Sequence, residues 1–191
     1  ATSYAPPNFH GKVLPAANSQ VLISFELVED GKLVDLSKET IYWYLNNKLF
    51  DSGKGLQNIV INAAEVPEVI QNIRIQINNF RNESRILVKT IEIPTVPPEV
   101  VIESAFPGNR VNAPRLTLRG IPYFFNVGGL SELIFSWQVN GQSPLNLGEP
   151  SVLDINLIEG ERGGELNVAL SVRSVRNALD SALKSIKLIS K

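Results

Sequence analysis

The side chains that most often carry out chemistry are sparse in this sequence. It contains no cysteine and a single histidine, His10. Without cysteine, the chain cannot form disulfide bonds, thiolate metal sites or a cysteine nucleophile. A serine-hydrolase triad would need His10 as its base, but His10 lies in the run Pro-Asn-Phe-His-Gly, and the sequence contains no Gly-x-Ser-x-Gly turn. We therefore predict no catalytic residues and interpret His10 as an exposed loop residue.

The acidic residues are densest in two short stretches, Glu29–Gly31 and Glu159–Glu161. A calcium site needs about six to eight oxygen ligands, usually from Asp or Asn at fixed spacing, and no Asp-x-Asp-x-Asp run is present. Glu29–Gly31 is typical of a turn between strands. The paired glycines at 128–129 and 163–164 lack the spacing of a phosphate-binding loop. We therefore predict neither a metal nor a cofactor, and we expect that the chain is not an enzyme.

Aromatic side chains offer more for binding than for catalysis. Tyr42 and Tyr44 flank Trp43 in the run Ile-Tyr-Trp-Tyr-Leu. Successive side chains of a strand point to opposite faces, so both tyrosines should lie on the outer face of a sheet whose inner face holds Trp43. Exposed aromatic rings are common in interfaces, which makes Tyr42 and Tyr44 candidate contact residues for a glycan or a protein partner.

A second aromatic run follows Pro122, where Tyr123, Phe124 and Phe125 stand next to each other before Asn-Val-Gly-Gly. In a strand these rings alternate between faces, so at least one should be exposed or lie under a loop. Two interpretations are open. The rings pack locally against Pro122 and its loop, or they form a contact patch for a partner domain or glycan, in which case all three are candidate contact residues.

The elements that would position these side chains are short β-strands. Residues 21–27, 41–45 and 73–77 each have apolar side chains at alternate positions. Ser24 and Glu26, Tyr42 and Tyr44, and Arg74 and Gln76 stand between them. Period-two alternation indicates half-buried antiparallel strands. Clusters of Gly, Asn, Asp and Pro separate them, which favours an all-β fold built as a β-sandwich.

The second half of the chain repeats the first. Trp137 lies 94 residues after Trp43, and Asn140–Gly141 takes the place of Asn46–Asn47 in the following turn. Asn-Gly is a strong hairpin signal because both residues tolerate positive φ. The alternating run 166–172 matches the run 73–77. We interpret this as a duplicated domain of about 95 residues.

These repeats predict the domain boundaries. Residues 1–93 form the first sandwich, with 1–18 as an extended N-terminal segment, and residues 99–191 form the second. Between them, residues 94–98 carry three prolines, which favour extended geometry and a short, stiff linker. Trp43 and Trp137 are the expected centres of the two cores.

The strand order, the two tryptophans and the Pro-rich joint resemble tandem immunoglobulin-like or PKD-like modules of bacterial cell-surface proteins. The resemblance implies two tandem immunoglobulin-like antiparallel β-sandwiches, each with a Trp packed between its sheets. The chain lacks the cysteine pair of antibody domains and the Trp-Asp-Phe-Gly-Asp run of PKD repeats. Such modules serve as spacers, adhesins and filament subunits, so the fold does not fix the function.

Two segments leave room for alternatives. Apolar residues at 172, 175, 179, 183 and 186 have helical spacing, but the repeat pairs this segment with the loop at 80–85 and favours a hairpin with its turn within 174–185.

The N-terminal residues 1–11 stand where the second copy has the strand-like run 98–103. Pro6 and Pro7 make that run suitable only for a sheet edge, which is either protected or open to a strand from a neighbouring molecule.

Bulk properties narrow the functional classes. The formal net charge is −1 and hydrophobic residues make up 43% of the chain. This charge gives no reason to expect nucleic-acid binding, and no apolar run is long enough to span a membrane. Methionine is absent, including at residue 1, so we expect a processed N-terminus or a segment of a longer protein.

From these features we expect a non-enzymatic structural or adhesive segment of a bacterial cell-surface protein, located outside the cytoplasm, such as a subunit of a filament or envelope layer. Its partners would be other proteins, copies of itself or glycans. Two alternatives are a glycan- or protein-binding module and a two-domain periplasmic assembly chaperone. The stiff linker and the lack of a clamp motif count against the chaperone.

Overall fold

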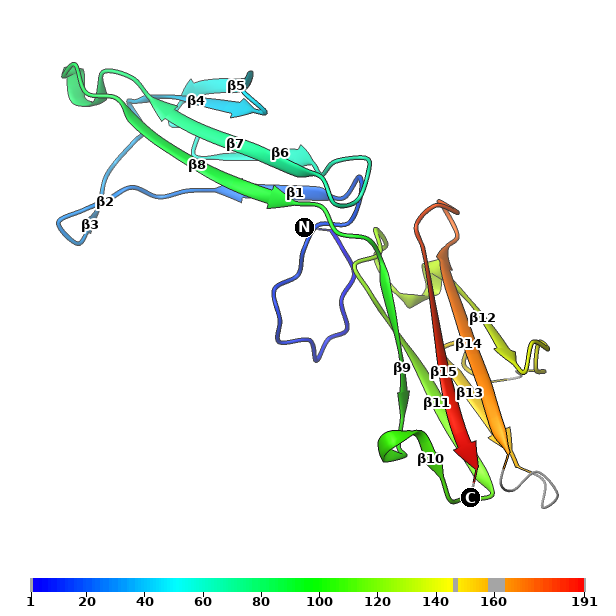
Figure 1. Cartoon of the computed structure of the whole chain (residues 1–191). Coiled ribbons are helices and arrows are strands. Elements are labelled where there is room, and N and C mark those ends of the chain that lie inside the picture. The colour runs from blue at the N-terminus through cyan, green and yellow to red at the C-terminus, as the bar shows by residue number, and fades with distance from the viewer. Residues whose placement is uncertain (1, 146–147, 158–163, 191) are drawn as a thin grey trace. The chain divides into compact units, whose positions relative to one another are not determined.

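The computed structural model describes residues 2–145, 148–157 and 164–190, so the acidic stretch 159–161 lies outside the described residues. Within them the chain is all-β, with strands and three single turns of 3-10 helix at Phe80–Asn82, Pro107–Asn109 and Leu130–Glu132. It divides into two compact units (Figure 1). The first unit comprises residues 1–2 and 14–96, and the second comprises residues 3–13 and 97–191.

The first unit is a sandwich of two antiparallel sheets. The larger sheet has the order β5-β4-β7-β8, the smaller sheet pairs β1 with β6, and β2 and β3 form a separate hairpin. The strands are β1 (Gln20–Ser24), β2 (Val28–Glu29), β3 (Lys32–Leu33), β4 (Thr40–Leu45), β5 (Lys48–Lys54), β6 (Asn58–Asn62), β7 (Ile70–Ile77) and β8 (Leu87–Pro94).

The core of the first unit is centred on Trp43, which is fully buried, and its indole N–H donates a hydrogen bond to the Leu56 carbonyl at 2.8 Å. A buried indole needs such a partner because an unsatisfied N–H costs free energy. The alternating residues of the two sheets surround the ring, as the period-two pattern predicts. The other buried apolar residues are Val21, Ile23, Leu36, Ile41, Ile59, Ile61, Ala63, Ile73, Ile75, Ile77, Phe80 and Ile93.

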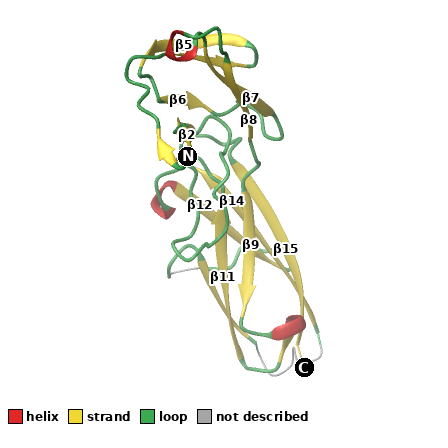
Figure 2. Cartoon of the chain, turned by 90° about the vertical axis from the view of Figure 1, so that its left-hand side faces the viewer, coloured by secondary structure: helices red, strands yellow, loops and turns green. Residues whose placement is uncertain are grey.

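The second unit repeats this architecture with longer strands (Figure 2). One sheet has the order β10-β15-β14-β12 and the other has the order β13-β11-β9. The pairing of β10 with β15 is parallel and the rest is antiparallel. The strands are β9 (Glu99–Ser104), β10 (Arg110–Val111), β11 (Arg115–Tyr123), β12 (Leu133–Val139), β13 (Val152–Asn156), β14 (Glu165–Ser174) and β15 (Ser181–Ser190).

The duplication extends to individual hydrogen bonds. The indole N–H of Trp137 donates to the Pro150 carbonyl at 3.0 Å, in the place of the Trp43 bond to Leu56. In both units the turn asparagine has a left-handed backbone with φ of 49°, and its side-chain Oδ1 accepts a backbone N–H from the facing strand at 2.9 Å. These are Asn46 with Asn72, and Asn140 with Asn167.

The chain is therefore all-β with two immunoglobulin-like sandwiches, and the predicted hairpin near residue 180 is present. β14 ends at Ser174 and β15 begins at Ser181, so the helical spacing of apolar residues across 172–186 is incidental. Tertiary pairing decides the matter, because every residue from 165 to 173 has a partner on β15. Local periodicity cannot report such a partner.

Two features of the ends of the first unit differ from the expected boundaries. Residues 3–13 belong to the second unit, although the sequence places residues 1–18 with the first sandwich. Residues 94–96, expected within the linker, pair inside the first unit: Pro94 lies in β8, the Thr95 N–H donates to Val69, and the Val96 N–H donates to Pro15. Pro97 and Pro98 alone stand between this ladder and β9.

Candidate functional site

The outer face of β4 and β7 in the first unit carries the two tyrosines singled out in the sequence. Tyr42 and Tyr44 are half-buried on this face, while Ile41 and Trp43 on the other face are fully buried. In the antiparallel register Tyr44 stands opposite Arg74. The alternation of β4 thus separates its core residues from its outward residues.

Arg74 is the residue on this face that the sequence does not single out. Its guanidinium carbon lies 4.0 Å from the centre of the Tyr44 ring, which is the geometry of a cation–π contact. Its Nε–H is buried and makes no hydrogen bond to any residue that the structure describes. Beside it, Gln76 stands opposite Tyr42 and donates to Asn78 Oδ1 at 2.8 Å. The face therefore combines two rings, a cation and an amide.

This combination can bind a ligand without altering the core. The rings offer flat apolar surface with a hydroxyl at one end, and the guanidinium offers N–H donors for hydroxyl, carbonyl or carboxylate groups. The signal for Arg74 is present in the sequence, because period-two alternation puts it outward on its strand. The register that places it opposite Tyr44 is visible only in the structure.

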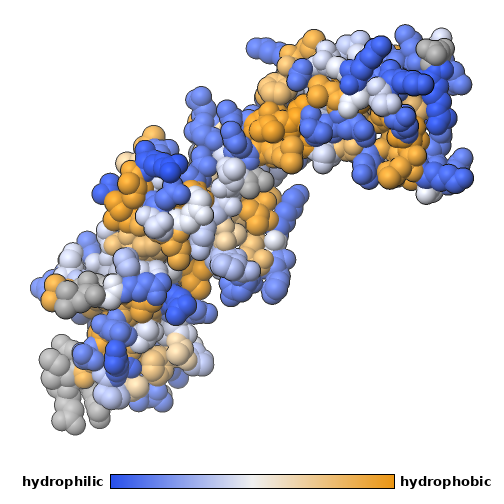
Figure 3. Space-filling model, turned by 180° about the vertical axis from the view of Figure 1, so that it is seen from behind, coloured by the Kyte–Doolittle hydropathy of each residue, from blue (hydrophilic) through white to orange (hydrophobic). Residues whose placement is uncertain are grey.

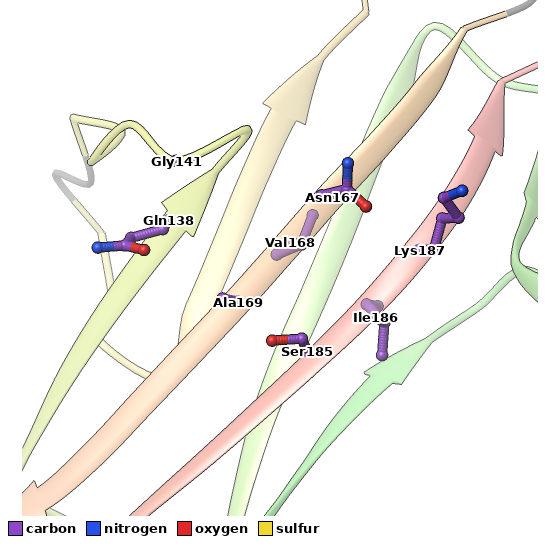
Figure 4. Close-up of a pocket in the computed structure, with 8 residues that line it drawn as sticks. All are labelled: Gln138, Gly141, Asn167, Val168, Ala169, Ser185, Ile186 and Lys187. Carbon is purple, nitrogen blue, oxygen red and sulfur yellow. The ribbon is translucent and has the colours of Figure 1, made fainter.

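The same face of the second unit has a different surface. Ser136 and Gln138 take the places of Tyr42 and Tyr44, and Ala169 stands opposite Gln138 where Arg74 stands opposite Tyr44. Small side chains leave a shallow depression of 310 Å³, shown in Figure 4. It is lined by Gln138, Gly141, Asn167, Val168, Ala169, Ser185, Ile186 and Lys187. Aromatic rings do not line it, and Lys187 is paired with Glu165 at 2.7 Å.

The aromatic run at 123–125 packs against the N-terminal segment. Phe125 is fully buried in the second core, so its proposed place on a contact surface is wrong. The Tyr4 N–H donates to the Phe125 carbonyl, and the Phe124 N–H donates to the Tyr4 carbonyl, both at 2.7 Å. Burial raises the pKa of the Tyr4 phenol, and the nearby Tyr123 phenol adds to the rise.

Phe9 covers the other two rings of the run. Its centroid lies 5.4 Å from that of Tyr123 and 6.1 Å from that of Phe124, both in edge-to-face geometry. Tyr123 and Phe124 are half-buried as a result. Edge-to-face pairs are a favourable arrangement for aromatic rings, so these two residues have a packing role within the second unit. Nothing local in the sequence connects residues 4 and 9 to residues 123–125.

The remaining candidates for chemistry are dispersed. His10 is exposed, and Glu29 pairs with Arg81 at 2.8 Å and with Arg85 at 3.7 Å. In the described parts of the chain, no group of three or more His, Cys, Asp or Glu residues is arranged to hold a metal ion. Nor does any helix there have the length and apolar character needed to cross a membrane.

Comparison with known proteins finds similar folds at low identity. Neither a family model nor a curated protein matches the sequence. Similar solved structures include the fibronectin(III)-like modules of CbhA from Clostridium thermocellum, at 13% identity and a TM-score of 0.38, covering 95% of this chain and 92% of that one. Three N-terminal domains of the outer capsid protein Hoc from bacteriophage RB49 match at 13% identity and a TM-score of 0.49, covering 92% of this chain and 55% of that one.

A glycan-binding protein is also among the similar structures. SGBP-B of Bacteroides ovatus, solved with a mixed-linkage heptasaccharide, matches at 16% identity and a TM-score of 0.28, covering 97% of this chain and 45% of that one. The chain thus spans about half the length of this protein and of the Hoc fragment. With such low identities and TM-scores, these likenesses assign neither a family nor a function to the chain.

Proposed function

We propose that this chain is a non-enzymatic structural or adhesive segment of a bacterial cell-surface protein, acting outside the cytoplasm. Its two sandwiches provide stable, separate cores, and their exposed faces contact protein partners, copies of the same chain or glycans. The observation that carries the proposal is the outward face of β4 and β7, where Tyr42, Tyr44 and Arg74 gather without contributing to the core.

The physical argument concerns preorganisation. Tyr44 and Arg74 hold each other at 4.0 Å on neighbouring strands of a paired sheet. Binding a ligand at this pair costs less side-chain entropy than binding that must first order a free arginine. Tyr and Arg are also enriched among the residues that dominate binding energy. We therefore assign the contact role to this face, with Tyr42 and Tyr44 as its rings.

The proposal is tested by substituting both tyrosines with serine. The double variant Tyr42→Ser/Tyr44→Ser is compared with wild type on arrays of bacterial glycans and in pull-downs from cell-envelope extracts. Loss of a ligand that wild type retains supports the proposal, provided that circular dichroism shows an unchanged fold. The matched control is Ser136→Ala/Gln138→Ser, which alters the equivalent positions of the second unit and should leave binding unchanged.

The structural part of the proposal is tested separately. Electron microscopy of native cell surfaces labelled with an antibody to this chain should show it in an ordered layer or filament. A diffuse cytoplasmic distribution would contradict both the location and the structural role.

A further inference from the structure

The smaller sheet of the first unit lacks one strand that the second unit has. In the second unit β9 pairs with β11 from Leu118–Ser104 to Tyr123–Glu99. β1 corresponds to β11, because Val21 pairs with Ile61 as Leu116 pairs with Ile155. In the described chain, however, β1 has only β6 as a partner strand. Residues 23–28 thus correspond to the part of β11 that β9 covers.

An apolar groove lies where the missing strand would be. It has a volume of 570 Å³ and runs between residues 24–27, at and just after the end of β1, and strands β7 and β8. Its walls are Ser24, Phe25, Glu26, Leu27, Ile75, Ile77, Leu87, Val88, Lys89 and Ile91. Figure 3 shows hydrophobic residues reaching the surface of the first unit among hydrophilic ones.

Residue exposure shows that the groove is unfilled. Phe25 and Leu27 are partly exposed, whereas Gly120 and Pro122, their counterparts under β9, are buried. In β9 the residues that face inward are Val100 and Ile102, both buried in the second core. In the first unit, no strand in the described residues supplies two such side chains at the corresponding place.

The backbone beside the groove is also open. The Phe25 N–H donates to the Gln57 carbonyl at 3.1 Å, toward β6. Glu26, the next residue, directs its N–H and carbonyl to the opposite side, because alternate residues of a strand do so. Its backbone makes no hydrogen bond to any residue in the described parts of the chain. An open edge of this kind can pair with an added strand.

The chain's own N-terminal segment is unsuited to fill the groove. Thr2 bonds to β1 at its start, where its N–H donates to the Gln20 carbonyl at 2.9 Å, but residues 3–13 then belong to the second unit. The residues that correspond to β9 include Pro6 and Pro7. Of two adjacent prolines in an edge strand, one must face the neighbouring strand, where it has no N–H to donate.

We propose that this groove accepts a β-strand donated by a different protein, which binds antiparallel to residues 23–28. The donated strand is free of proline and has aliphatic side chains at two alternate positions, as β9 has at Val100 and Ile102. The residue between them faces Glu26 and is basic, because Glu26 occupies the position of Ile121, which pairs with Val101. The apolar strands in the described part of this chain already have partners, so a second copy has none to offer.

The test uses the chain's own β9 sequence as the probe. A labelled synthetic peptide of residues 99–105 carrying Val101→Lys is titrated into the full chain by fluorescence anisotropy. We expect saturable binding, and about tenfold weaker binding when the peptide carries Val101→Glu instead, since a like charge then faces Glu26. A peptide with Val100→Asp and Ile102→Asp should not bind.

Two variants of the protein separate the contribution of the Glu26 backbone N–H to peptide binding from that of the Glu26 side chain. Glu26→Pro removes the open N–H and should weaken the Lys peptide about tenfold or more, because a ladder hydrogen bond is lost. Glu26→Ala keeps the N–H, so it should retain binding and lose only the preference for Lys over Glu. Thermal melts of both variants confirm that the first unit is folded.

Three outcomes would overturn the proposal. The first is equal affinity for all peptides, and the second is binding of an apolar dye but of no peptide. The third is self-association of the chain that Glu26→Pro abolishes, because a second copy would then be the occupant. The site is distinct from the Tyr42–Tyr44 face, so failure here leaves the proposed function standing, and the converse also holds.

Discussion

The two units solve the same packing problem with different side chains. Next to Trp43 the first unit has Phe25, whose ring meets the indole edge-to-face at 5.6 Å. The matching position of the second unit is Gly120, and both residues donate the same backbone hydrogen bond, to Gln57 and Ser151 respectively. A Cβ on Gly120 would clash with Leu170 Cδ2. In the second unit, Leu170 thus occupies the space at this position, where the first unit has the Phe25 side chain.

The backbone ladder, more than the identity of the core residues, is therefore common to the two units. The pairs Trp43–Ile75 and Trp137–Leu170 have the same register, and both indoles donate to a carbonyl 13 residues further on. The side chains that fill the space around the two indoles differ in size between the units. Cores tolerate such exchanges when total volume and patterning are kept.

Removing either indole should have the largest effect. Trp43→Ala should lower the free energy of unfolding of the first unit by about 3–5 kcal/mol, because it leaves a cavity and an unpaired Leu56 carbonyl. Each unit holds one Trp, so the fluorescence of Trp137 reports the second unit in this variant. A urea titration should show the Trp137 transition unchanged, and simultaneous loss of both units would contradict separate cores.

Filling the glycine position of the second unit should cost less. Gly120→Ala should destabilise this unit by about 1–3 kcal/mol through overpacking against Leu170. The measurement is denaturant unfolding in a Trp43→Phe background, where Trp137 is the only indole. Adding Leu170→Ala should make the cost of Gly120→Ala smaller, and a double-mutant cycle that gives no coupling would show that the two side chains do not compete.

The turn asparagines test whether the two hairpins are equivalent. Asn46→Ala and Asn140→Ala should each cost about 1–2 kcal/mol, because Ala disfavours φ of 49° and loses the bond to the facing strand. Glycine at either position keeps the left-handed backbone and should cost less than alanine. Equal losses in the two units would support a shared role, whereas a loss confined to one would end the equivalence.

The smallest expected effect is on the stability of the second unit at acid pH. Asp154 accepts hydrogen bonds from Thr117 and Arg115, which lower the pKa of its carboxyl below the usual 3.8. Its stabilisation is therefore present above pH 3.8 and is lost as the pH falls through the folded pKa. Asp154→Asn should remove this loss from the second unit, measured as stability against pH from pH 5 to 2.

The acid experiment has an internal control. The first unit has Val60 in place of Asp154, so its own transition should be unaffected by the substitution. Burial raises the pKa of the Asp180 carboxyl despite the hydrogen bond that it accepts from the Asn126 N–H. Its effect on stability is therefore opposite to that of Asp154, because it favours the folded second unit at low pH. An Asp154→Asn variant with the same acid sensitivity as wild type would show that Asp180 and other groups set the profile.

Much of the fold can be predicted from alternation and repetition. The strand at 41–45, the duplication and the hairpin near 180 follow from period-two patterns and a constant spacing. The strand expected over 21–27 ends at Ser24, because its ladder with β6 ends at the Ser24–Asn58 pair and no second described strand pairs with the residues that follow. The site is predictable only in part. Alternation places Tyr42 and Tyr44, but the pairing with Arg74 depends on register. The cover over Tyr123 and Phe124 comes from Phe9, more than a hundred positions away in the sequence.

The placement of Ser3–Val13 has a consequence for synthesis. These residues are translated before the first sandwich, yet the Tyr4 backbone bonds to Phe124 and Phe125, which are translated only after that sandwich. Residues 3–13 therefore lack these backbone partners until residues 124 and 125 have been translated. An expression fragment that starts at residue 97 would leave Tyr123 and Phe124 without the Phe9 ring that packs against them. We expect this fragment to aggregate more readily than the intact chain.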